Sequence, residues 1–268
     1  MLECVVNVSE GRRPEVMAAL AAAAGPTLLD LHADAHHNRC VLTLAASAGL
    51  EEAVRAVAGE AVALIDLRSH EGAHPRLGAV DVVPFVPLAG ASLADAVAAR
   101  DRFTEWAAAT LHLPCFAYGP ERSLPEVRRR AFVDLAPDTG PSLANPTAGA
   151  VCAGARPVLV AYNVWLAPDS SLAEARAIAR QLRGPAVQAL GLDVGGRIQV
   201  SMNLVAPATV GPASVYDAVA AQAPVDRAEL VGLAPLAVVE AVPAERWADL
   251  DFDPSRTIEA RLSRRHRD

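Results

Sequence analysis

The sequence of 268 residues contains no lysine, few aromatic residues and no long apolar run. All 24 basic residues are arginine, and 31 acidic residues bring the formal charge to -7, which argues against non-specific nucleic-acid binding. No apolar stretch approaches the roughly 20 residues that a membrane-spanning helix needs. The first residues lack a basic segment followed by an apolar one, so we expect a cytoplasmic protein without a secretory signal.

The four cysteines are isolated from one another and form no C-x-x-C pair of the kind found in redox and zinc motifs. Three of them lie in apolar, strand-like runs. We therefore expect buried, reduced thiols.

The hydrophobic content is 52%, and the chain is long enough for two small domains. Periodicity and turn signals predict the same order of elements, strand-helix-strand-strand-helix-strand, in each half. The first set is residues 2–8, 14–24, 27–31, 40–46, 51–64 and 80–88, and the second is 157–166, 172–183, 187–192, 198–204, 214–221 and 230–236. This order predicts an α/β (α+β) fold of two ferredoxin-like βαββαβ subdomains with a substrate cleft between them.

Residues 137–155 are rich in glycine and proline and show no periodicity. This segment is the candidate connection between the domains. The expected division is therefore residues 1–136, a connection at 137–155, and residues 156–268.

Five of the seven histidines fall in two short polar segments, at residues 30–39 and 68–78. Histidine, carboxylate and arginine side chains held by strands are typical of active sites. The first segment alternates nitrogen and oxygen donors, at His32, Asp34, His36 and His37, so a metal site is a second interpretation. Solvated loops remain the simplest interpretation of any one of these histidines.

His74 is the sharpest candidate for proton transfer. Pro75 favours an extended backbone at His74, and Gly72 and Gly78 allow tight turns on either side. A near-neutral imidazole can take and return a proton at physiological pH.

The segment from Asn7 to Arg12 leaves the first strand and enters a helix. Free main-chain N–H groups at such a point favour an anion. An equally good interpretation is that Ser9 caps the helix and Gly11 forms a turn.

Together, several strings make the sequence similar to the formiminotransferase domain of the formiminotransferase-cyclodeaminase family, over nearly the whole chain. The most specific is His74-Pro-Arg-Leu-Gly-Ala-Val-Asp81. Others in the first half are Glu3 to Arg12, Asn38-Arg39, Ile65-Asp66, Val83 to Pro87 and Tyr118-Gly119. The second half adds Gly140-Pro-Ser142, Gly154-Ala-Arg156, Asn163, Gln199 to Leu204 and Leu230 to Leu233.

This resemblance implies transfer of a formimidoyl, or formyl, group between N-formimidoyl-L-glutamate and tetrahydrofolate, in histidine degradation and one-carbon metabolism. The family's catalytic histidine falls on His74, and its folate-contacting loop on Gly140 to Gly149. The resemblance also implies a homodimer, with tetrahydrofolate as co-substrate and no metal.

We expect substrate or folate to contact a set of polar and glycine positions in these strings. Carboxylates could pair with a cationic amidine, and arginine forks are natural clamps for the carboxylates of the substrate. The candidates are Asn7, Glu10, Asp34, Asn38, Arg39, Arg76, Arg122, Gly140, Pro141, Ser142, Asn145, Gly149 and Asn203.

Two other functions stay open. A metal-dependent hydrolase of formimidoyl or formyl amino acids would use the first histidine segment. A non-catalytic folate-binding relative would keep the scaffold without turnover.

Overall fold

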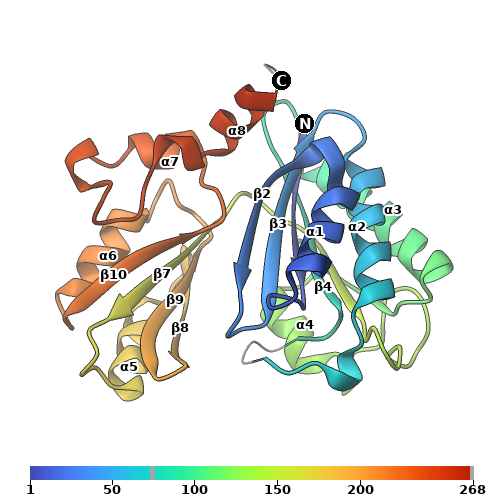
Figure 1. The fold of residues 1–268 in the computed structure, drawn as a ribbon, viewed down its shortest axis with the longest axis horizontal. Helices are drawn as coiled ribbons and strands as arrows, with labels where there is room; N and C mark the ends of the chain where they lie inside the picture. Colours follow the sequence, from blue (N-terminus) through green and yellow to red (C-terminus); the bar gives the residue numbers. More distant parts are fainter. Residues whose placement is uncertain (73–75, 266–268) are drawn as a thin grey trace. The chain divides into compact units, whose positions relative to one another are not determined.

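The computed structural model describes residues 1–72 and 76–265, which form two compact units, Met1–Pro157 and Val158–Asp268 (Figure 1). His74 therefore lies outside the described residues. None of the helices within these ranges has the length and apolar character needed to cross a membrane.

The first unit alternates strands and helices along the chain. Its elements are β1 (Leu2–Val8), α1 (Pro14–Ala24), β2 (Leu28–Asp34), β3 (Arg39–Ala46), α2 (Leu50–Leu64), β4 (Val80–Pro87), α3 (Leu93–Thr110), β5 (Cys115–Tyr118), α4 (Leu124–Arg130) and β6 (Val151–Ala155). Every second side chain of β1 faces the core, where Cys4, Val6 and Val8 are fully buried. This alternation places β1 against the helices of the unit.

The strands of the first unit form one six-stranded sheet in the order β2-β3-β1-β4-β6-β5. The first four strands are antiparallel to their neighbours, and β4, β6 and β5 run parallel. The part made of β1 to β4 has the ferredoxin-like order that the sequence predicts. Strands β5 and β6, with α3 and α4, extend it.

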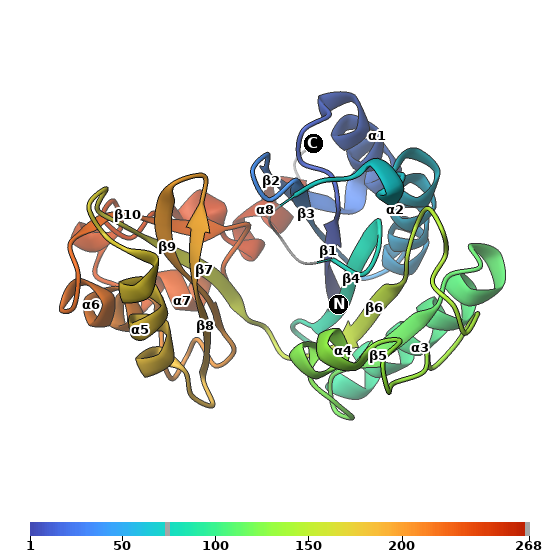
Figure 2. The same cartoon turned by 90° about the horizontal axis from the view of Figure 1, so that it is seen from below.

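Helices α1, α2 and α3 cover one face of this sheet (Figure 1). Helix α3 begins at a capping box formed by Ser92 and Asp95. Helix α4 packs against the opposite face, where Val127 contacts a cluster that includes Val82, Phe116 and Cys152 (Figure 2).

The boundary between the units falls later than the sequence analysis expected. Residues 137–155 belong to the first unit, because β6 pairs with both β4 and β5 inside the sheet. A short strand buried on both faces is hard to recognise when glycine and alanine fill it.

The second unit contains β7 (Val160–Leu166), α5 (Leu172–Leu182), β8 (Val187–Val194), β9 (Arg197–Leu204), α6 (Pro212–Ala220), β10 (Val225–Val231), α7 (Leu236–Glu240) and α8 (Ile258–Arg265). Its antiparallel sheet has the order β10-β7-β9-β8, again the ferredoxin-like arrangement. The predicted capping box at Ser171 and Glu174 begins α5.

The α/β fold with two βαββαβ units is thus confirmed. Two details differ. Strand β2 continues to Asp34, so His32 and Asp34 lie on a strand and the turn is short. The last predicted strand, 230–236, begins earlier, as β10, and α7 starts at Leu236.

All four cysteines are free and buried, as predicted. Burial raises the pKa of Cys40 and Cys152 to about 12. These thiols therefore stay protonated and serve as core residues.

Candidate functional site

One end of the six-stranded sheet collects most of the predicted site residues. Strands β1 and β2 end there, and β3, β4, β5 and β6 begin there, as the strand registers require. The loops at this end carry or adjoin Asn7, Glu10, Asp34, Asn38, Arg39, Arg76, Gly140, Asn145 and Gly149.

Glu10 organises the loop between β1 and α1. Its buried carboxylate accepts the main-chain N–H groups of Arg12 (2.8 Å) and Arg13 (3.0 Å), and Arg13 Nε at 2.5 Å. Burial acts to raise the pKa of Glu10, but these hydrogen bonds outweigh it and lower that pKa. The anion at this helix N-terminus is therefore the protein's own carboxylate.

Ser9 does not cap α1, in contrast to one interpretation of the sequence. Its hydroxyl donates to the carbonyl oxygen of Gly78 at 2.8 Å, and its main-chain N–H donates to Ala79 at 2.8 Å. Ser9 thus ties the first loop to the segment that follows His74.

Asn38 links three segments of chain. Its backbone is left-handed (φ 48°), its Oδ1 accepts Gly11 N–H at 3.0 Å, and its Nδ2 donates to the carbonyl of Glu71 at 2.8 Å. Gly11 is required at this contact, because a Cβ there would lie 2.4 Å from the Asp34 carbonyl oxygen. Asn38 is consequently a brace between loops.

Asp34 pairs with His37 across the β2–β3 turn. The carboxylate accepts both the main-chain N–H of His37 and its ring Nδ1, each at 2.8 Å. Burial acts to raise the pKa of Asp34, but the bonds from His37 outweigh it and hold that pKa below its usual range. Asp34 is therefore ionised at neutral pH.

Arg76 follows residues 73–75, and its side chain holds the main chain that precedes them. Its Nη2 donates to the Gly72 carbonyl at 2.6 Å, and its Nη1 to the His70 carbonyl at 3.1 Å. With Asn38 on Glu71, three consecutive carbonyl groups are held by side chains. Arg76, predicted as a carboxylate clamp, uses two of its donors on the main chain.

Asp81 holds the other side of this segment, and sequence reasoning gave it no role. Its Oδ1 accepts Leu77 N–H at 2.7 Å, and its Oδ2 pairs with Arg128 at 2.5 Å. An aspartate inside an otherwise apolar run, Val80–Pro87, was the signal in the sequence that could have found it, and the structure buries Asp81 to 2% exposure.

Asn145 and Gly149 contact the same segment from the predicted folate loop. The Asn145 side chain accepts N–H groups of Thr147 and Ala148, which forms a compact turn. Gly149 has φ 71° and bridges Gly78, and a Cβ on it would lie 2.1 Å from the Leu77 carbonyl oxygen. This part of the loop therefore packs directly beside the residues that follow His74.

The described contacts of the other predicted site residues are with parts of the chain other than the residues on either side of 73–75. Gly140 packs against the Leu113 carbonyl before β5, and Pro141 and Ser142 beside it are exposed. Arg122 pairs with Asp138 at 2.8 Å along the outer edge of β5. Asn203 lies on β9 in the second unit.

Asn7 and Arg39 lie on strands. The Asn7 side chain donates to the carbonyl of Val5 at 3.1 Å. Burial lowers the pKa of Arg39, and the carboxylates of Asp81 and Asp34 act in the opposite direction. Arg39 is thus close enough to Asp81 and Asp34 for their charges to act on it.

The histidines of the first segment were the alternative candidates for a metal site. Within residues 1–72 and 76–265, no group of three or more His, Cys, Asp or Glu side chains is arranged to hold a metal ion. His32 lies on β2, and His36 meets His37 edge to face.

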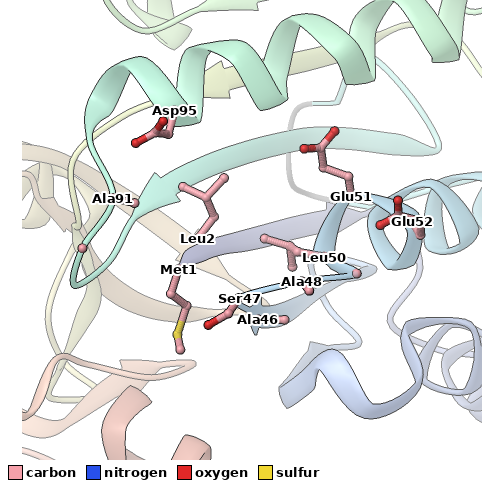
Figure 3. Close-up of a pocket in the computed structure, with 12 residues that line it drawn as sticks. Met1, Leu2, Ala46, Ser47, Ala48, Leu50, Glu51, Glu52, Ala91 and Asp95 are labelled. Carbon is pink, nitrogen blue, oxygen red and sulfur yellow. The ribbon is translucent and has the colours of Figure 1, made fainter.

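Among the hollows on the described part of the first unit, two bear on the candidate site. The larger, of about 450 Å³, lies at the opposite end of the sheet, where β1 begins (Figure 3). Its carboxylates serve local structure, because Glu51 pairs with Arg102 and Asp95 caps α3. The smaller, of about 310 Å³, lies beside the candidate site and is lined by Glu10, Arg12, Arg13, Asn38, Leu64, Ile65, Asp66, Ser69 and His70.

Comparison with known proteins gives a consistent result. Residues 1–156 match a family model described as the formiminotransferase domain, N-terminal subdomain. The chain is 38% identical to glutamate formimidoyltransferase of Streptococcus pyogenes serotype M1 over 232 residues, which cover 76% of this chain and 77% of that protein. It is 31% identical to the glutamate formimidoyltransferase of Thermoplasma acidophilum over 300 residues, 98% of each chain.

A longer relative is the formimidoyltransferase-cyclodeaminase of Sus scrofa, 35% identical over 274 residues. This match covers 88% of the present chain but 50% of the pig protein. The chain thus spans about half the length of this relative.

Proposed function

The chain belongs to the formiminotransferase family, and on that basis we propose that it transfers a formimidoyl group from N-formimidoyl-L-glutamate to tetrahydrofolate. The observation that carries the proposal lies on both sides of residues 73–75, where Asn38 and Arg76 hold the carbonyls of Glu71 and Gly72, and Asp81 holds the N–H of Leu77. His74 stands between these held residues in the sequence, and the proposed reaction needs a positioned proton carrier.

The reaction itself requires two proton movements. N5 of tetrahydrofolate attacks the amidine carbon of the donor and forms a new C–N bond, and N5 loses its proton. The bond from that carbon to the glutamate nitrogen then breaks, and this nitrogen gains a proton. His74 is proposed to accept the first proton and return it to the leaving nitrogen, so no other acid or base is needed.

The electrostatics of the surrounding loops suit a cationic amidine. The lowered pKa of Asp34 keeps its carboxylate ionised at neutral pH, whereas the Glu10 carboxylate is already paired with Arg13. Tetrahydrofolate is proposed to contact the loop formed by Gly140, Pro141, Ser142, Asn145 and Gly149. Asn145 and Gly149 lie beside the segment that follows His74, which supports this part of the proposal.

A role in histidine degradation, a cytoplasmic location and a homodimer remain predictions from the sequence. The cyclodeaminase activity in the name of the longer relatives is not proposed for this chain, because the match covers half of those proteins.

The direct test is an assay of the purified chain with formimidoylglutamate and tetrahydrofolate, followed by folate absorbance. We expect formimidoyl-folate to accumulate only when both substrates are present, and a chelator to leave the rate unchanged. Donor hydrolysis without folate, abolished by a chelator, would favour the hydrolase. Folate binding without turnover would favour a non-catalytic relative.

A further inference from the structure

The three arginines predicted to clamp substrate carboxylates are all engaged within the first unit. Arg76 holds main-chain carbonyls, Arg122 pairs with Asp138, and Arg39 lies in the field of Asp81 and Asp34. A donor that carries carboxylates still needs a cationic partner. An arginine with free donors in a cavity would supply that partner.

Arg12 meets this description. Its Nε donates to the Ala35 carbonyl at 2.7 Å, which fixes the side chain, while its two terminal nitrogens have no partner in the part of the chain that the structure describes. Arg12 also lines the 310 Å³ pocket beside the candidate site. That volume is near the lower limit for small-molecule sites, so the occupant is small.

The other charges in this pocket are already paired. Glu10 is neutralised by Arg13, and Asp66 by Arg68 at 2.5 Å. Arg12 is thus the one uncompensated charge among the described lining residues, and the pocket favours an anionic group. A guanidinium with two free terminal nitrogens matches the geometry of a carboxylate.

His70 supplies a second, independent observation. Its imidazole forms part of the pocket wall, and both ring nitrogens are shielded from solvent without a hydrogen-bond partner among residues 1–72 and 76–265. Burial, and then the Arg76 guanidinium, lower the pKa of His70, so the ring is neutral. Because protein atoms cover these nitrogens, a ligand in the pocket meets the carbon edge of the ring, and His70 contributes an uncharged wall.

We infer that this pocket is a carboxylate-binding subsite, in which Arg12 holds one carboxylate of an acidic amino acid against the wall formed by His70. The inference rests on the proposed function only for the identity of the ligand, which is then the glutamate portion of the donor and of the product. Ser69 and Asn38 border the same space and limit it to a short chain.

The test is calorimetric titration of the full chain with L-glutamate, the product of the proposed reaction. Arg12→Gln should weaken binding at least tenfold, and Arg12→Lys should weaken it less, because the charge remains without the fork. His70→Phe, which keeps the shape of the ring, should weaken binding severalfold. Arg180→Gln, at an exposed position on α5, is the matched control and should bind like the native chain.

Kinetics separate this inference from the proposed function. In an active chain, Arg12→Gln should raise KM for formimidoylglutamate at least tenfold and leave KM for tetrahydrofolate unchanged. An active native chain whose Arg12→Gln variant keeps its glutamate affinity and donor KM overturns the inference alone. An inactive native chain that binds glutamate through Arg12 overturns the proposed function and supports the pocket.

Discussion

The two units share one strand order but use their polar side chains differently. In the first unit, Asn38, Arg76 and Asp81 form hydrogen bonds to the main chain of irregular loops. In the second unit, a group of polar side chains on the sheet surface pairs with one another instead, since Glu229 accepts from both Asn163 (3.1 Å) and Trp165 (2.8 Å).

The difference follows from what each backbone needs. The loops of the first unit leave many N–H and C=O groups without sheet or helix partners, so side chains must supply them. In the sheet of the second unit, strands supply most of one another's hydrogen bonds, and side chains add to them at the edge strands, where Asp251 accepts the N–H of Leu230 and Arg183 donates to the carbonyl of Ala189. Along β9, Gln199, Ser201 and Asn203 alternate with core residues. Side chains that hold irregular backbone therefore mark the unit where chemistry is expected.

The largest expected effect is the loss of His74. His74→Gln should lower kcat by about two to four orders of magnitude while the fold and most substrate affinity remain, which is the usual range for a positioned acid-base group. Steady-state kinetics and circular dichroism measure both.

His36→Gln is the matched control, because His36 is exposed in the β2–β3 turn, and it should do far less. Near-normal turnover in His74→Gln, or a stoichiometric metal whose removal stops the reaction, would contradict the assignment.

The next largest effect is expected at Gly78, which packs against the main chain of Ala150 where the loop before β4 meets the loop before β6. Gly78→Ala would place a Cβ 2.1 Å from the Ala150 carbonyl oxygen. We expect a loss of about 3 kcal/mol in the free energy of unfolding, measured by urea denaturation. Gly184→Ala in the second unit meets nothing within 4 Å and should change stability by under about 1 kcal/mol. Equal losses at both positions would remove the contrast between the units.

A smaller effect is expected at Arg76. Arg76→Gln should lower kcat about tenfold with less change in KM, because the variant loosens the segment around His74 while leaving the binding groups in place. Arg76→Lys should fall between the two. Arg227→Gln, which removes a guanidinium stacked 4.5 Å from the Trp165 ring centroid in the second unit, should leave kcat unchanged. A pure KM effect at Arg76 would instead support the original role as a clamp.

The smallest effect concerns Asp34 and pH. Because the pKa of Asp34 is lowered in the folded state, its stabilisation is fully present above its unfolded pKa and is lost as the pH falls through the folded value. Asp34→Asn should cost about 1 kcal/mol at pH 6 and progressively less below about pH 4.

Asp217→Asn, at an exposed pair with Arg246 in the second unit, should cost less than about 0.5 kcal/mol at pH 6. Urea denaturation between pH 3 and pH 6 makes the comparison. A cost at Asp34 that is constant across this range would rule out the titration.

Much of the scaffold was predictable from local patterns. The capping boxes at Ser92 and Ser171, the buried alternation of β1 and the glycine hairpin between β8 and β9 all follow from short-range physics. Strand β6 was not predictable, because alanine and glycine carry little strand signal and its place depends on pairing with β4 and β5.

For the candidate site, the sequence indicated which loops carry polar residues but not which contacts their side chains make. Arg76 and Arg122 were expected to hold a ligand, and the structure places them on protein partners. Arg12 and Asp81 both lie inside the strings that carry the family resemblance. Nothing in the sequence around them showed that the Arg12 guanidinium keeps free donors or that the Asp81 carboxylate is paired.

By itself, the sequence determined the fold class, the doubled βαββαβ order and the position of the polar loops, because periodicity, caps and turns act over a few residues. Only the tertiary structure decided which side chains hold the backbone and which keep free donors. That choice depends on contacts between segments far apart in the chain, such as Asn38 with Glu71 and Asp81 with Arg128, and local patterns carry no record of such contacts.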